Sequence, residues 1–239
     1  MQDTVEAALA AFATQPMRTH CAGRTDTGVH AVQQVIHIDT PIERDAQSWV
    51  RGTNRFLPAD VAVQWCKPVG LDFHARGSAV GRTYRYWCVM SRVRPSLHAG
   101  QVGWVFRPLD VAAMRAAAAH VLGEHDFSAF RSSQCQAKTP VRHLRRLDVR
   151  QHGRWFCFEF EASAFLHHMV RNLMGMLITI GQGTQPPSWM LEVLASRSRQ
   201  AAAPTFAADG LYFLGPTYPP EHGIPRTSDD AHAAWPLAD

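Results

Sequence analysis

The stretch Ala22-Gly23-Arg24-Thr25-Asp26-Thr27-Gly28-Val29-His30-Ala31 is the most informative part of this chain. It places a guanidinium, on Arg24, and a carboxylate, on Asp26, between two glycines and directly before an expected strand. Glycine tolerates positive φ and allows close approach, so such a turn can display a reactive acidic side chain at a sheet edge. The alternative is a polar β-turn in which Thr25 and Asp26 bond nearby amides.

The composition is that of an ordinary globular protein. The 239 residues are 46% hydrophobic and 18% charged, enough for one large domain or two small lobes. No apolar run approaches the about 20 residues that span a bilayer, and no secretory signal is recognisable, so we expect a cytoplasmic protein without a membrane partner. Five cysteines without a Cys-x-x-Cys pair argue against a disulfide framework and against a structural zinc site.

The charge balance favours a polyanionic partner. The formal net charge is +4 and the pI is about 9.0, and most of the cations are arginines, whose planar fork suits phosphate. The alternative is a solvated basic surface with no such partner. The arginine clusters are Arg82/Arg85, Arg92/Arg94 and Arg142/Arg145/Arg146/Arg150.

Hydrophobic periodicity predicts an α+β protein. Expected strands cover residues 18–22, 29–39, 61–67, 79–90 and 211–215, and a hairpin joins 142–151 to 154–161 at His152-Gly153. Expected helices cover an opening segment that Pro16 ends, then residues 43–56, 110–122, 165–180 and 188–196. We expect an N-terminal lobe over residues 1–98, a C-terminal lobe over 99–218, and a loosely ordered tail over 219–239.

The opening stretch resembles the catalytic loop of the TruA family of tRNA pseudouridine synthases. Further blocks that resemble the family follow in the family's order. These blocks are Asp72-Phe73-His74-Ala75-Arg76, Arg82-Thr83-Tyr84-Arg85-Tyr86, Gly123-Glu124-His125-Asp126-Phe127-Ser128-Ala129-Phe130, Phe165-Leu166-His167-His168-Met169-Val170-Arg171-Asn172 and Gly210-Leu211-Tyr212.

The resemblance implies a fold and an activity. The expected fold has two similar lobes that share a continuous mixed, mostly antiparallel sheet flanked by helices, with a catalytic cleft between the lobes. The expected activity is isomerisation of uridine to pseudouridine in tRNA, on the 3′ side of the anticodon stem-loop. The resemblance also implies a homodimer, and a reaction that uses no cofactor and no metal. No dinucleotide-binding, Walker or His-Glu-x-x-His motif is present in the sequence.

The same resemblance assigns the site residues. It makes Asp26 the nucleophile, although the sequence leaves open whether this carboxylate attacks the sugar or the base, or removes a proton. Arg171 would supply a counter-charge to Asp26, and Tyr84 would stack on the target uracil. Strand alternation puts Tyr86 on the face of Tyr84, where we expect it to be a core residue. The implied substrate-binding residues are Arg24, which would fill the gap left by the flipped nucleotide, Arg82, His30, Leu211 and His168.

Other interpretations remain open at this point. His167 and His168 do not suggest a metal site, because adjacent helical residues point about 100° apart and no third ligand stands at a suitable spacing. We expect them to pack or to face RNA. The alternatives to the enzyme are a noncatalytic tRNA-binding or tRNA-folding protein and an inactive truncated relative, because the family's usual first strand and Gly-Trp-Gln segment are missing. We expect the native protein to extend upstream of Met1. A metal hydrolase built on the thirteen histidines lacks ligand spacing.

Overall fold

The computed structural model describes residues 1–225, whose contacts group the chain into two units. The first unit contains Met1–Arg24, Gln34–Ala79 and Tyr218–Pro225. The second unit contains Thr25–Gln33 and Val80–Thr217. The lobe boundary expected between residues 98 and 99 falls inside the second unit, because strands on both sides of it pair with each other.

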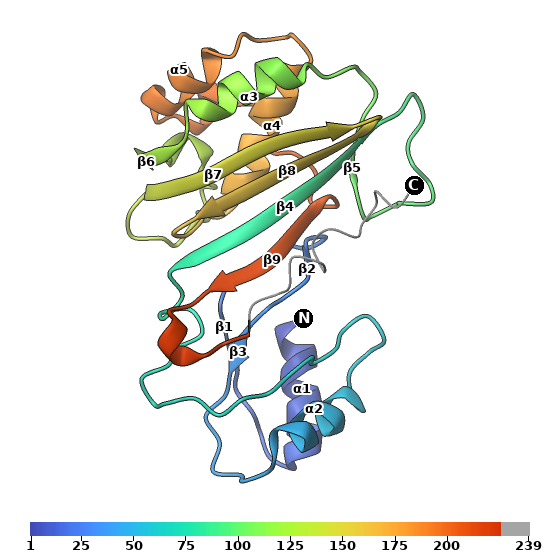
Figure 1. The fold of residues 1–239 in the computed structure, drawn as a ribbon, viewed down its shortest axis with the longest axis vertical. Coiled ribbons are helices and arrows are strands. Elements are labelled where there is room, and N and C mark those ends of the chain that lie inside the picture. Colours follow the sequence, from blue (N-terminus) through green and yellow to red (C-terminus); the bar gives the residue numbers. More distant parts are fainter. Residues whose placement is uncertain (226–239) are drawn as a thin grey trace. The chain divides into compact units, whose positions relative to one another are not determined.

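A mixed sheet forms the framework of the second unit (Figure 1). Its long strands are β4 (Gly81–Met90), β7 (Val141–His152), β8 (Trp155–Ala162) and β9 (Leu211–Thr217), and its short strands are β2 (His30–Ala31), β5 (Gly103–Val105) and β6 (Gly123–Asp126). The order is β2-β9-β4-β8-β7-β6, and β5 pairs with β4. The β2–β9 and β4–β5 pairs are parallel and the other pairs are antiparallel, so the expected mixed, mostly antiparallel sheet is confirmed.

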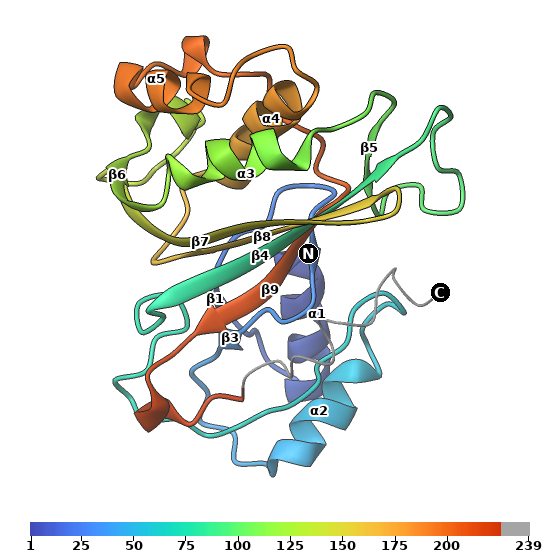
Figure 2. The same cartoon turned by 45° about the horizontal axis from the view of Figure 1, so that its top comes forward.

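Three helices cover one face of this sheet (Figure 2). They are α3 (Val111–Ala119), α4 (Met169–Gly181) and α5 (Trp189–Ser196). Asp110 caps α3 by accepting a hydrogen bond from the amide of Ala113. Helix α4 is buried nearly all round, and a Cβ on its Gly181 would lie 2.8 Å from the sulfur of Met114 in α3. A small residue there lets the two helices approach closely above the phenylalanine-rich face of β8.

The first unit contains helices α1 (Gln2–Ala13) and α2 (Ala46–Asn54) and a short antiparallel pair of β1 (His20–Cys21) with β3 (Ile36–His37). Phe12 of α1 packs edge-on against Trp49 of α2, with ring centroids 5.3 Å apart. This pair anchors a small apolar cluster that also holds Leu9, Ala13 and Met17. No helix within residues 1–225 is both long enough and apolar enough to span a membrane.

Two expected strands are wrong in the first half of the chain. Residues 61–67 form no strand, because the side chain of Asn54 binds both the amide and the carbonyl of Val63, at 2.7 and 2.8 Å, and replaces a neighbouring strand. The expected strand 29–39 is split into β2, which pairs in the large sheet, and β3, which pairs with β1. Between them, Gln34 hydrogen bonds through its side chain to both backbone groups of Gly23.

The expected tail is ordered as far as it is described. Pro220–His222 form a short 3₁₀ helix, η3, and Lys67 donates a 2.8 Å hydrogen bond to the carbonyl of Gly223. The ring of His222 also lies 5.2 Å from that of Phe73. These contacts bind residues 219–225 to the first unit, and the remainder of the expected tail, 226–239, lies outside the described residues.

Candidate active site

Asp26 lies in a tight turn just before β2. The amide of Val29 donates to the carbonyl of Asp26 at 3.1 Å and closes the turn. Gly28 adopts φ +85°, and a Cβ at this position would come within 3.3 Å of the Ala208 side chain. Glycine is therefore required here both by the backbone conformation and by the close approach of the chain before β9. The turn leaves the Asp26 side chain 22% exposed.

The second part of the site is the backbone that leads into α4. His168 has φ 64° and ψ 2°, a left-handed conformation that residues other than glycine seldom adopt. This residue is the N-cap, so α4 begins at Met169 and not at Phe165 as expected. The amide of His167 donates to the sulfur of Cys135 at 3.4 Å, which holds the segment in place before the helix starts.

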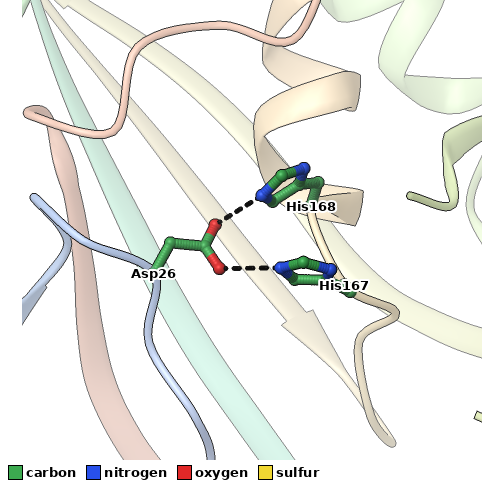
Figure 3. A group of neighbouring side chains, drawn as sticks. All are labelled: Asp26, His167 and His168. Carbon is green, nitrogen blue, oxygen red and sulfur yellow. Dashed lines mark hydrogen bonds and ion pairs between the residues drawn. The ribbon is translucent and has the colours of Figure 1, made fainter. Parts of the chain in front are cut away.

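Three side chains from this segment converge on the Asp26 carboxylate. His167 Nε2 lies 3.1 Å from Oδ1, and His168 Nε2 lies 3.2 Å from Oδ2. Figure 3 shows both rings directed at the carboxylate from the start of α4. Arg171, in the first turn of α4, donates through Nη1 to Oδ2 at 3.0 Å. The side chains of Asp26, Arg171, His168 and His167 are 22, 18, 28 and 35% exposed, so the group is half-buried and still open to a ligand.

The Arg171 guanidinium is fixed from a second direction. Its Nε donates to the carbonyl of Phe206 at 2.9 Å, and the amide of Phe206 donates to the carbonyl of Arg171 at 3.1 Å. These two hydrogen bonds hold the Arg171 side chain in a conformation that directs Nη1 at the carboxylate. The guanidinium therefore orients the Asp26 carboxylate through a charge-assisted hydrogen bond.

The positions of His167 and His168 differ from those expected from the sequence. The argument that adjacent helical side chains diverge does not apply, because both residues precede the helix and His168 is left-handed. Their ring centroids lie 4.0 Å apart, and Asp26 supplies the third potential ligand that sequence spacing did not reveal. Burial lowers the pKa of His168 first of all, and Asp26 opposes that effect while His167 and Arg171 add to it. The pKa of His168 therefore lies below its ordinary value of 6.5.

Tyr84 of β4 lies beside the segment that carries the histidines. Its ring meets that of Phe165 edge-on at 5.1 Å and that of Phe213 on β9 at 4.9 Å. Two residues further along β4, Tyr86 is fully buried and donates to the carbonyl of Ala207 at 2.9 Å. The expectation that Tyr86 is a core residue is confirmed.

Comparison with known proteins identifies the family. A family model described as tRNA pseudouridine synthase matches residues 117–219. A protein from Methylibium petroleiphilum named tRNA pseudouridine synthase A is 64% identical over 226 residues, which cover 95% of this chain and 87% of the relative. This chain belongs to the tRNA pseudouridine synthase family. Relatives of the same name from Polaromonas naphthalenivorans and Bordetella petrii are each 60% identical, and cover 94 and 99% of this chain and 87 and 89% of their own length.

The other substrate-binding residues implied by the pseudouridine synthase resemblance do not all join Asp26. Arg82 donates from Nη1 to the carbonyl of Ser163 at 3.1 Å. Leu211 is 5% exposed and belongs to the core cluster around Tyr86. His30 stacks on Tyr212 at 4.6 Å and bonds the carbonyl of Gly100, and neither of these contacts involves Asp26. Arg24 is exposed and belongs to the first unit.

The arginines of β7 are bonded within this pseudouridine synthase. Arg142 donates to the carbonyl of Thr139, and Arg145 donates to that of Val80. Arg146 pairs with Glu159 and Glu161, and Arg150 pairs with Asp148. These arginines therefore stabilise the sheet in the free protein, and only those on its surface can also reach a phosphate.

Proposed function

We propose that this chain isomerises uridine to pseudouridine in tRNA, with Asp26 as the nucleophile. The observation that carries the proposal is the half-buried Asp26 carboxylate, held by Arg171 at 3.0 Å and by two histidine nitrogens at 3.1 and 3.2 Å. A carboxylate that forms a covalent intermediate has to be ionised and oriented before substrate arrives. The three contacts hold the Asp26 carboxylate in one orientation.

The two carboxylate oxygens are not equivalent. Oδ2 is shared by Arg171 and His168, whereas within residues 1–225 the partner of Oδ1 is the more exposed His167. We therefore assign Oδ1 as the attacking oxygen. The reaction breaks the N1–C1′ bond, forms a C5–C1′ bond and moves a proton from C5 to N1, so atoms and electrons balance without an oxidant or a reductant.

Tyr84 would supply the stacking surface for the uracil. Its neighbours Phe165 and Phe213 hold the ring from two sides, and Phe165 is two residues from His167. An aromatic side chain held in this way stacks on a flipped base at low entropic cost. Arg24, Arg82, His30, Leu211 and His168 complete the proposed substrate-binding set, in which Arg24 fills the gap left by the target nucleotide.

The family relationship supports a tRNA substrate, because the relatives carry that substrate in their names. We assign the 3′ side of the anticodon stem-loop as the target region and a homodimer as the active form, both from the resemblance to the family. Two-fold symmetry is the commonest arrangement of oligomers and would give a long anionic substrate two basic surfaces.

Carbodiimide mapping of unmodified tRNA after incubation with the purified protein tests the activity. The expected result is new pseudouridine on the 3′ side of the anticodon stem-loop. Binding of tRNA without any pseudouridine would instead support a noncatalytic tRNA-binding protein.

A further inference from the structure

Three potential metal ligands meet at one point of the second unit (Figure 3). They are a carboxylate oxygen of Asp26 and one ring nitrogen each of His167 and His168, all within 4.8 Å of one another. This is the one such group of three or more histidine, cysteine or acidic residues among residues 1–225. Imidazole nitrogens together with a carboxylate oxygen are a donor set typical of zinc.

A tetrahedral ion sets the separations that its ligand atoms need. Bonds of about 2.0–2.1 Å from zinc place neighbouring ligand atoms about 3.3–3.4 Å apart. His167 Nε2 lies 3.1 Å from Oδ1 and His168 Nε2 lies 3.2 Å from Oδ2, so the two short contacts are to different oxygens of the carboxylate. One ligand atom from each of the three residues lies within 4.8 Å of the other two. The carboxylate has to rotate for one of its oxygens to face both nitrogens, and a bound ion then replaces the present contacts of Asp26 with the histidines. The left-handed backbone of His168 already brings the two rings together.

We propose that Asp26, His167 and His168 form a binding site for a divalent transition-metal ion of the zinc type, and that the bound ion blocks the carboxylate. Three protein ligands leave a fourth position for water. The ion occupies the carboxylate that the proposed reaction needs, so it inhibits the enzyme reversibly. Metal binding itself does not depend on the proposed activity and can be measured without it.

Arg171 makes the site distinctive. Its guanidinium lies 3.0 Å from the same carboxylate and repels a bound cation. Replacement of Arg171 by methionine removes this repulsion and leaves the three ligands in place. We therefore expect the R171M variant to bind zinc more tightly than the wild type. Zinc bound at an unrelated surface site would not show this increase.

A second group of histidines provides the matched control. His20, His37 and His74 lie in the first unit with ring centroids 4.7–5.5 Å apart. Their ring nitrogens lie less close together than those of His167 and His168 lie to Asp26. Nδ1 of His37 accepts a hydrogen bond from the amide of Ala75, and Nδ1 of His74 accepts from the amides of Arg76 and Gly77. Zinc bound at this control group would be sensitive to H74A and insensitive to changes at His167.

Titration calorimetry of the chelator-treated, untagged full chain with Zn²⁺ tests the proposal. We expect one ion per chain, affinity reduced at least about tenfold in H167A and in H168N, unchanged affinity in H74A, and increased affinity in R171M. Asparagine is chosen at His168 because it tolerates the left-handed backbone. Wild-type affinity in H167A and H168N, or an affinity that depends on His74, would overturn the proposal.

A measurement on the unaltered protein protects the test against variants that do not fold. Zn²⁺ added to protein with ¹⁵N-labelled histidines should shift the ring resonances of His167 and His168 and leave the other histidines in place. Absence of a shift at these two residues at saturating Zn²⁺ would also overturn the proposal. Zn²⁺ should in addition inhibit pseudouridine formation, and a chelator should restore it.

Discussion

Arg171 donates from Nη1 to Oδ2 of Asp26 over 3.0 Å, although the two residues are 145 positions apart in the sequence. The turn before β2 and the first turn of α4 thus form one site within the second unit. Since R171M removes the donor that orients the Asp26 carboxylate, we expect this variant to reduce kcat by about 100-fold or more. Single-turnover assays of pseudouridine formation measure this change.

The matched control for this prediction is R171K. Lysine retains the charge but lacks the fork that binds Phe206 and Asp26 at the same time, so we expect an intermediate rate. Equal rates for wild type and R171M would show that the ion pair has no part in turnover.

Tyr84 provides a second prediction. The Y84L variant loses the aromatic surface proposed to stack on the uracil, which is typically worth about 1–3 kcal/mol, or about 5- to 150-fold in kcat/KM. Y84F retains the ring and should keep most of the activity. If Y84L has the kinetics of the wild type, Tyr84 has only a packing role against Phe165 and Phe213.

Glu159 provides a prediction about stability and pH. Burial raises the pKa of this carboxyl, but hydrogen bonding and charge from Arg85 and Arg146 outweigh it, so the pKa lies below its ordinary value of 4.5. A carboxyl group with a depressed pKa contributes its full stabilisation above its unfolded-state pKa. This stabilisation is lost as the pH falls through the folded-state pKa. E159Q should therefore lower the free energy of unfolding by about 3 kcal/mol at pH 7, because Arg85 is 12% exposed and loses its ion pair with Glu159.

Urea unfolding at several pH values measures this effect. The difference between wild type and E159Q should shrink steadily as the pH falls below about 4.5. A difference that does not change with pH would mean that charge pairing at Glu159 does not stabilise the sheet. E192Q is the control, since Glu192 lies on the surface of α5 and should have little effect at any pH.

The proposed homodimer is tested by light scattering at micromolar concentration. The expected mass is twice the 26.6 kDa of the chain. Addition of tRNA should then give a complex of one tRNA with two chains. A monomer that persists over the concentration range would contradict the dimer.

The sequence predicts the long elements of the large sheet well. The alternating residues of β4 and the Gly153 turn of the β7–β8 hairpin, at φ 54°, specify strands with little competition from other structures. The sequence-based prediction is wrong for residues 61–67, where the apolar pattern indicates a strand. There the Asn54 side chain forms hydrogen bonds with the backbone amide and carbonyl of Val63. A long-range side-chain contact of this kind leaves no local pattern.

The site is predictable in part. The family resemblance names Asp26 and Arg171, and the structure brings them together. The place of His167 on Oδ1 is missed, because it depends on the left-handed backbone of His168, which an i to i+1 helical argument cannot anticipate. Histidine's moderate tolerance of positive φ is the one local hint in the sequence.

Pseudouridine formation by D26N is the most direct test of Asp26 as the nucleophile. Asparagine keeps the size and polarity of Asp26 but removes the ionisable carboxylate, so the account predicts no pseudouridine in carbodiimide mapping while filter binding shows tRNA affinity close to that of the wild type. A D26N protein that still forms pseudouridine at a substantial rate would contradict the assignment of Asp26 as the nucleophile.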